Sequence, residues 1–211
     1  MDPKLKDKVS QADLLIVIGT RLGETATQSY ELLSPNQPHA RGRMIHIHSD
    51  PGELRRVHAA EVVYTATAPD MLAALARQAE ALPATPHLRP WTQTARTDFL
   101  AWKAPAESPG MLKQEEVISW LSETLPEDTI LTNGAGNYAA WLHRYFHYKA
   151  HGTQLAPTSG SMGYGLPAAI SAKLEHRDKT VICFAGDGCL QMTINELSTA
   201  AQYGVGIIVI V

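Results

Sequence analysis

The chain has 211 residues, of which 45% are hydrophobic and 18% charged, and its net charge is −3 at pH 7. This composition is typical of an ordinary globular protein with one or two domains. A slightly negative charge without a cluster of Lys or Arg argues against a general nucleic-acid binder. The chain start lacks a signal-peptide core and the apolar runs are too short to span a bilayer, so we expect no membrane segment. Cys183 and Cys189 do not suggest a disulfide framework, which favours a reducing, cytoplasmic location.

Strands and one helix are predicted for the first part of the chain. Residues 11–18 and 44–48 predict buried strands, and residues 61–64 predict a shorter one. Residues 69–80 predict a helix with a proline in its first turn. Strands that alternate with loops and helices indicate a parallel α/β layer.

Glycines and histidines in this part have structural interpretations. Gly19 and Gly23 follow the first strand without the spacing of a nucleotide-binding motif, so we interpret this loop as one that needs a positive φ. His46 and His48 share one face of a strand, but no Cys or carboxylate stands at ligand spacing. We therefore expect residues at the edge of the core and not a metal site.

Prolines mark a boundary in the middle of the chain, and residues 91–102 between them predict an amphipathic helix. We predict a first domain over residues 1–82, a linker with a helix over 83–109, and a second domain over 110–211. The prolines are Pro83, Pro86, Pro90, Pro105 and Pro109.

The second part again alternates helices and strands. Residues 110–121 and 193–203 predict helices, and a further helix passes through Trp141 and Tyr145. Unbroken apolar runs predict buried parallel strands; the strands lie over residues 129–132, 181–185 and 205–211.

Three glycine-rich loops lie at strand ends or helix starts, over residues 133–137, 159–163 and 186–189. In a parallel sheet such loops converge on one edge, where α/β sheets bind ligands. Asp187 would there be a hard oxygen donor, suited to hold Mg²⁺ against a diphosphate. His143 and His147 are four residues apart but lack the Glu of a His-Glu-x-x-His motif, so we interpret them as surface or packing residues.

The ordered motifs resemble those of one enzyme family. The motifs are the Gly134 loop, the run from Gly160 to Pro167, and Gly186-Asp187-Gly188 followed by Glu196-Leu197. The chain thereby resembles the thiamine-diphosphate-dependent 2-oxo-acid enzymes, most of all the large catalytic subunit of acetolactate synthase. Residues 12–21 and 45–51 resemble the second half of the family's central domain, and residues 110–211 resemble most of its diphosphate-binding domain.

The resemblance implies thiamine diphosphate and Mg²⁺ as cofactors and a 2-oxo acid as substrate. Asp187 matches the metal ligand, Gly160 the carbonyl that accepts from the cofactor's 4′-amino group, and Met162 the apolar residue that supports the cofactor's V shape. The residues expected to contact the cofactor are Gly134, Ala135, Gly136, Asn137, Gly160, Ser161, Met162, Gly186, Asp187, Gly188 and Cys189. Acetolactate synthases also bind FAD through the central domain, and such contacts would fall on Thr20, Arg21 and Asp50.

The family's remaining parts are absent from the sequence. Its activating Glu comes from an N-terminal domain, so no catalytic residue is assigned here. Its second metal ligand, an Asn, would fall just past Val211, and Asn195 is not that ligand. We therefore expect a fragment that is inactive alone, belonging to a protein that forms a homodimer or homotetramer.

Other functions stay open. Within the family, a decarboxylase of the benzoylformate or oxalyl-CoA type is an alternative to the acetolactate-synthase-like carboligase. A truncated module that keeps the fold without catalysis is another. A dinucleotide-dependent dehydrogenase would fit the α/β pattern, but the glycine fingerprint and the acidic ribose-binding residue are missing.

Overall fold

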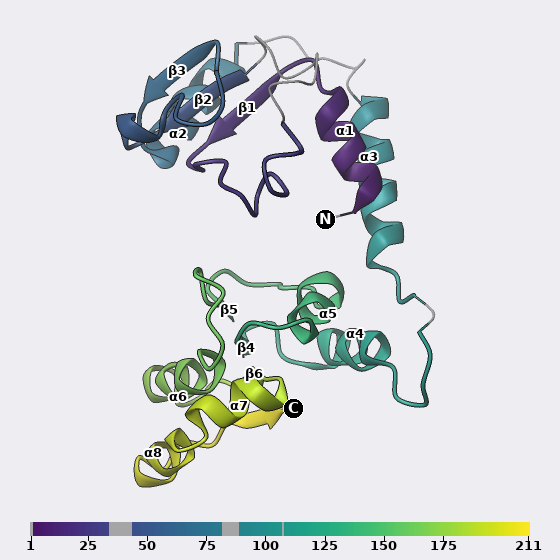
Figure 1. Ribbon diagram of the computed structural model, residues 1–211, viewed down its shortest axis with the longest axis vertical. Helices are drawn as coiled ribbons and strands as arrows, with labels where there is room; N and C mark the ends of the chain where they lie inside the picture. Colours follow the sequence, from purple (N-terminus) through teal and green to yellow (C-terminus); the bar gives the residue numbers. More distant parts are fainter. Residues whose placement is uncertain (1, 34–43, 82–88, 107) are drawn as a thin grey trace. The chain divides into compact units, whose positions relative to one another are not determined.

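The computed structural model describes residues 2–33, 44–81, 89–106 and 108–211. It divides into two compact units, Met1–Trp102 and Lys103–Val211, and each contains its own parallel sheet (Figure 1). The predicted α/β class is therefore confirmed. The predicted domain boundaries stay a prediction. Within the described ranges, no helix has both the length and the hydropathy needed to cross a bilayer.

The first unit contains a three-stranded sheet in the order β1-β2-β3. The strands are β1 (Leu15–Ile18), β2 (Met44–His48) and β3 (Val62–Thr65). The bounds predicted for β2 are confirmed, and those of β3 are shifted by one residue. Helix α2 (Ala68–Ala79) confirms the predicted helix, and Thr67 caps it because its hydroxyl accepts from the Asp70 N–H at 3.3 Å. The core of this unit contains Val17, Leu22, Leu32, Leu33, Met44 and Ala60.

The prediction of a buried strand over residues 11–18 was wrong at its start. Helix α1 (Pro3–Gln11) includes residue 11, and the strand begins only at Leu15. The helix forms before the strand because the Asp2 carboxylate accepts from the Lys4 N–H at 3.0 Å and a proline opens the first turn. The strand is also only partly buried, because β1 is an edge strand of this sheet and Ile16 is 53% exposed.

Helix α3 (Arg89–Lys103) contains the predicted helix of the middle segment and runs alongside α1 (Figure 1). Lys8 of α1 lies over the Trp91 ring, 5.0 Å from its centroid, and the Lys4 ammonium lies 3.4 Å from the Asp98 carboxylate. These contacts place α3 within the first unit.

The second unit contains a four-stranded parallel sheet in the order β5-β4-β6-β7. Side chains alternate along the two central strands, so that Val181 and Cys183 face one core while Ile182 and Phe184 face the other. The strands are β4 (Ile130–Asn133), β5 (Gln154–Leu155), β6 (Val181–Phe184) and β7 (Ile208–Ile210). Every residue of β4 and β6 is buried, as predicted for central strands of a parallel sheet.

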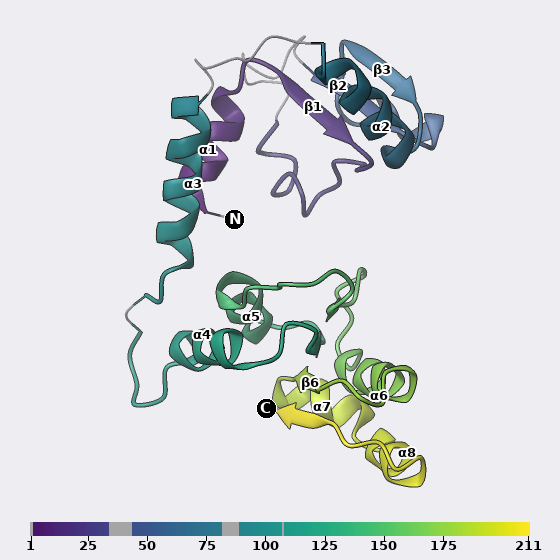
Figure 2. The same cartoon turned by 180° about the vertical axis from the view of Figure 1, so that it is seen from behind.

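Helices cover both faces of this sheet and make a three-layer unit (Figure 2). One core includes side chains of α6, α7 and α8, and the other includes side chains of α4 and α5. These helices are α4 (Gln114–Thr124), α5 (Tyr138–Tyr145), α6 (Gly165–Glu175), α7 (Asp187–Thr193) and α8 (Glu196–Gln202).

Three predictions for this unit were wrong in detail, and one strand was missed. A helix over 193–203 was predicted, but α7 begins at Asp187 and α8 follows after a break at Ile194–Asn195. The break follows Thr193, whose hydroxyl donates to the Gly163 carbonyl at 3.0 Å. Helix α4 begins at Gln114 and not at residue 110, and β7 is shorter than its predicted run. The two-residue strand β5 was missed, because two residues leave no periodic signal.

His143 and His147 do not share a helix. Helix α5 ends at Tyr145, so the expected spacing of four residues along one helix does not arise. His143 contacts Asn133, and the backbone N–H of His147 donates to the Ser122 hydroxyl at 2.8 Å.

Glu115 is a buried carboxylate in the first turn of α4. The Ser108 hydroxyl donates to its Oε1, and this hydrogen bond is the main cause that lowers the pKa of Glu115. Its own backbone N–H and the Trp141 side chain act in the same direction. The carboxylate thus ties the segment before α4 to the start of that helix.

We expect the stability of the chain to fall between pH 7 and pH 3 partly because of Glu115. A folded-state pKa below the unfolded value of 4.5 stabilises the fold above that value, and this contribution is lost as the pH falls through the folded pKa. The Glu115→Gln variant should therefore be less stable at neutral pH and should lose less stability on acidification. Urea midpoints across this range measure it, with Glu123→Gln, an exposed residue of the same helix, as the control. Equal acid slopes in wild type and Glu115→Gln would contradict the assignment.

Candidate functional site

Two of the three predicted loops lie side by side because their strands are paired. Strands β4 and β6 are parallel neighbours in a register that places Asn133 beside Phe184. The loop over 134–137 and the turn that starts α7 therefore leave the same edge of the sheet. The Cys189 thiol donates to the Ala135 carbonyl at 2.8 Å and joins the two segments directly.

The third loop reaches the same place, because glycines before α6, in α6 and in α7 allow close approaches. A Cβ on Gly165 would lie 3.0 Å from the Gly134 nitrogen, and a Cβ on Gly188 would lie 3.2 Å from the Met162 methyl carbon. Gly163 has a positive φ of 82° and packs against Thr193 of α7. The structure therefore brings residues from all three loops together at one sheet edge.

Asp187 is exposed at the first position of α7. Gly186 precedes the helix in an extended conformation, and its carbonyl accepts from the Leu190 N–H at 2.9 Å. Within the described part of the chain, the Asp187 carboxylate has no hydrogen bond or ion pair, so it is free to bind a cation. No group of three His, Cys, Asp or Glu side chains gathers as a metal site in that part.

The loop over 134–137 is held by its carbonyl groups. The Asn133 side-chain amide donates to the Gly134 carbonyl at 2.8 Å, and Cys189 holds the Ala135 carbonyl. In a planar trans peptide the C=O and N–H groups point in opposite directions. The N–H groups of Ala135 and Gly136 are therefore directed away from these donors, where an anion can accept from them.

Asn137, Gly160 and Ser161 are exposed. Gly160 has a positive φ of 68°, and a Cβ there would meet nothing within 4 Å. A glycine is therefore favoured at this position by the backbone conformation and not by a close neighbour. The Ser161 hydroxyl lies 2.7 Å from that of Ser159. The Asn137 side chain makes no capping hydrogen bond at the start of α5.

Asn133 and Tyr138 support the loops and were not among the predicted cofactor residues, and His143, interpreted as a surface or packing residue, contacts Asn133. His143 Nε2 lies 3.3 Å from the Asn133 Oδ1, and burial lowers the pKa of His143, which favours the neutral ring as donor. The Tyr138 ring packs against Gly136 and Gly186. The sequence offers only one signal for these residues, their position next to a strand end that carries glycines.

The expected flavin contacts lie at the carboxyl edge of the first unit's sheet. Thr20 and Arg21 follow β1, and Asp50 follows β2, the neighbouring strand. The Thr20 carbonyl lies 2.8 Å from His46 Nε2, and the Asp50 carboxylate accepts from the Gly52 N–H at 2.8 Å. Gly19 has a positive φ of 74°, which confirms the predicted loop conformation. These contacts are structural and say nothing about a flavin.

Comparison with known proteins gives two family matches. Residues 134–211 match the model described as thiamine pyrophosphate enzyme, C-terminal TPP binding domain. Residues 1–75 match the model described as thiamine pyrophosphate enzyme, central domain. The matched ranges contain every candidate cofactor residue and all three strands of the first unit's sheet.

The chain is also similar to curated acetolactate synthase large subunits. It is 33% identical to that of Corynebacterium glutamicum over 93% of this chain and 31% of the relative. It is 31% identical to the isozyme 1 large subunit of Escherichia coli K12 over 92% of this chain and 33% of the relative. It is 30% identical to that of Parasynechococcus marenigrum over 96% of this chain and 32% of the relative. The chain thus spans about a third of the length of these relatives.

Proposed function

Since the chain belongs to the thiamine pyrophosphate enzymes and matches both their central domain and their C-terminal TPP-binding domain, we propose that it is part of a Mg²⁺-dependent enzyme acting on 2-oxo acids. The proposed reaction is decarboxylation of pyruvate followed by carbon–carbon ligation, as the name of its acetolactate synthase relatives suggests. The observation that carries the proposal is the meeting of three glycine-rich loops beside an unpaired Asp187.

The residues present fit a bound diphosphate and a cation. Glycines at 134 and 188 lie where a Cβ would come 3.1 Å from the Cys189 sulfur and 3.2 Å from the Met162 methyl, so larger residues would close the space between the loops. The N–H groups of Ala135 and Gly136 would donate to the phosphate oxygens from one side. The Asp187 carboxylate would hold Mg²⁺ against them, because Mg²⁺ prefers oxygen ligands.

Each side chain has a defined task in this arrangement. Asp187 neutralises part of the cation's charge, and Met162 supplies apolar surface next to the Gly188 backbone. Cys189 and Asn133 keep the Ala135 and Gly134 carbonyls turned inward. When bound, the cofactor supplies the carbon nucleophile and the electron sink for decarboxylation.

The site described here needs further groups. A single carboxylate with phosphate oxygens leaves the near-octahedral coordination of Mg²⁺ incomplete, and no residue of the chain is assigned to activate the cofactor. We propose that these groups come from the parts of the intact enzyme that its relatives contain. Apolar side chains are available to receive such a part, since Met162 and Met192 are 46% and 60% exposed and Tyr164, two residues after Met162, is also exposed.

The partners and location follow from the same proposal. The intact enzyme is proposed to act as a homodimer or homotetramer in the cytoplasm, with sites formed between subunits. A flavin in the central domain is proposed with contacts at Thr20, Arg21 and Asp50. Sedimentation of the intact enzyme measures its oligomeric state, and flavin absorbance measures whether it binds a flavin.

We expect the purified 211-residue chain to show no decarboxylation of 2-oxo acids with thiamine diphosphate and Mg²⁺. It should bind the cofactor only weakly, and supplying the activating domain of a relative in trans should increase a magnesium-dependent heat of binding. Calorimetry measures cofactor binding, and carbon dioxide release measures decarboxylation. Turnover by the chain alone would refute the fragment proposal, and absence of any magnesium-dependent heat with the domain supplied would favour a noncatalytic module.

Product analysis with pyruvate, alone and with a second 2-oxo acid, separates a ligase from a decarboxylase.

A further inference from the structure

Tyr138 occupies an unusual place at the candidate site, because glycines from two loops pack against its ring. A Cβ on Gly136 would lie 2.8 Å from the ring carbon Cε1, and a Cβ on Gly186 would lie 3.2 Å from it. A Cβ on Gly134 would lie 3.1 Å from the hydroxyl oxygen of the same side chain. Real Cβ atoms do not tolerate the first of these approaches, so the ring and the glycines are fitted to one another.

The ring therefore lies between the loop over 134–137 and the turn that carries Asp187. Gly134 and Gly136 belong to the loop after β4, while Gly186 belongs to the turn after β6. The second tie between these segments is the hydrogen bond from Cys189 to the Ala135 carbonyl. The hydrogen bond holds the two segments together, and the ring limits how close they come.

The hydroxyl group of Tyr138 does not explain the presence of a tyrosine there. Its oxygen is buried beside the Cys189 thiol and the N–H groups of Gly134 and Gly186, without reaching hydrogen-bond geometry with any of them. Burial, followed by the neighbouring thiol, raises the pKa of Tyr138, so the phenol stays neutral. A buried hydroxyl without a partner is unfavourable, which indicates that the volume of the ring is the useful property.

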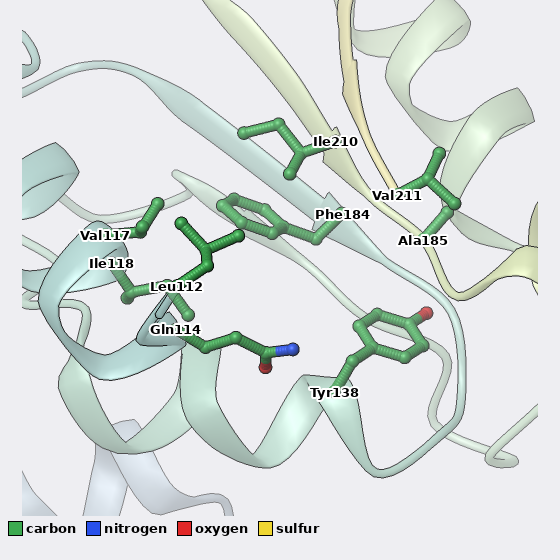
Figure 3. Close-up of a pocket in the computed structure, with 9 residues that line it drawn as sticks. All are labelled: Leu112, Gln114, Val117, Ile118, Tyr138, Phe184, Ala185, Ile210 and Val211. Atoms are coloured by element: carbon green, nitrogen blue, oxygen red, sulfur yellow. The ribbon is translucent and has the colours of Figure 1, made fainter. Parts of the chain in front are cut away.

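The other face of the ring borders an apolar hollow of about 130 Å³. Figure 3 shows the hydroxyl pointing away from Leu112 and Val117, while Phe184 and Ile210 lie across the hollow. The ring also packs against residues of both cores of the unit, which hold it in place.

We infer that Tyr138 is a positioning residue that sets the separation between the two glycine turns of the cofactor site. This inference rests on the proposed function, because the separation matters only if a diphosphate and its cation lie between those turns. The aromatic ring fulfils the role, and the hydroxyl group is dispensable.

Amide hydrogen exchange of the 211-residue chain tests this with three variants. Tyr138→Leu removes the ring and should speed exchange about tenfold or more in both segments, 133–137 and 186–189, because both lose one support. Tyr138→Phe keeps the ring and should leave exchange in both segments near that of wild type. Tyr148→Leu is the matched control, since Tyr148 also has a buried hydroxyl without a partner but packs against Phe146. Unchanged exchange in Tyr138→Leu, or a change in one segment only, would overturn the inference.

A second variant covers the case in which Tyr138→Leu does not fold. Gly186→Ala pushes a methyl group against the ring and should raise exchange over 133–137, because the side chain that the added Cβ would meet is that of Tyr138. Gly206→Ala, where a Cβ would meet nothing within 4 Å, is its control. Exchange over 133–137 that does not respond to Gly186→Ala would contradict the inference.

Titration with thiamine diphosphate and Mg²⁺ separates this inference from the function on which it rests. Tyr138→Phe should bind as wild type does, and Tyr138→Leu should bind several-fold more weakly. If wild type shows no binding even with the activating domain supplied, the proposed function fails while the exchange data still decide the role of the ring. Equal binding by wild type and Tyr138→Leu overturns the inference and leaves the function intact.

Discussion

Replacing Asp187 by Asn should reduce magnesium-dependent binding of thiamine diphosphate by roughly a hundredfold, since a carboxylate next to a cation near a protein surface contributes several kcal/mol. Asn keeps the shape and one oxygen donor but loses the charge. The carboxylate is exposed and unpaired in the described structure, so the change should leave the thermal midpoint almost unchanged. Phosphorus NMR of the cofactor at millimolar concentration detects even weak binding, and removal of the metal by a chelator should mimic the variant.

Asp178→Asn is the matched control for this prediction. Asp178 is an exposed carboxylate in the turn between α6 and β6, at the amino end of the strand whose carboxyl end leads to Asp187. The control variant should bind as wild type does. Equal binding by Asp187→Asn and wild type would remove the metal role from Asp187, and with it the observation on which the proposed function depends most.

The largest expected loss of stability follows from Gly165→Ala. The added Cβ would lie 3.0 Å from the Gly134 nitrogen, 3.1 Å from the Asn133 carbonyl carbon and 3.2 Å from the Cys183 sulfur. Two of these atoms belong to the backbone of a buried strand end, which cannot move aside cheaply. We expect a free energy of unfolding lower by about 3 kcal/mol from overpacking, against which the better helix propensity of Ala returns at most about 1 kcal/mol.

Thermal unfolding checks this prediction, and the midpoint should fall by roughly 4–8 °C for a chain of this length. Gly206→Ala is the control within the same unit, because a Cβ there has open space. The loop over 134–137 is displaced by the same substitution, so cofactor binding should weaken as well. A midpoint of Gly165→Ala equal to that of the control would contradict the prediction, because it would mean that the backbone at residues 133 and 134 moves aside at little cost.

Most of the fold could be predicted, because its strands carry strong local signals. Residues 181–184 are a short apolar run, and residues 44–48 alternate apolar residues with histidines after Met44. Both form strands with nearly the predicted bounds. The meeting of the three loops also followed from a general property, since the carboxyl ends of parallel strands lie on one edge. The start of α7 did not follow, because a helix that begins on Gly186 and Asp187 has no side-chain cap and too few residues for a periodic pattern.

The supporting residues of the site could not be predicted for a different reason. Asn133 acts through a hydrogen bond to its neighbour's carbonyl, and Tyr138 acts through contacts with glycines at 136 and 186. Such roles depend on distances across the sheet edge, which sequence spacing does not express. Glycines indicate that something comes close to the backbone, but they do not name the side chain that does so.

The pairing of β4 with β6 also has a consequence for how the protein reaches its native state. The two strands adjoin in the sheet, yet about fifty residues separate their paired positions along the chain. Closing so long a loop costs chain entropy before any contact between the strands compensates it, and parallel pairing of this kind is slow. The turn that carries Asp187 and the loop over 134–137 therefore come together only after this long-range step. During synthesis, the ribosome must release both strands before the edge they share can exist.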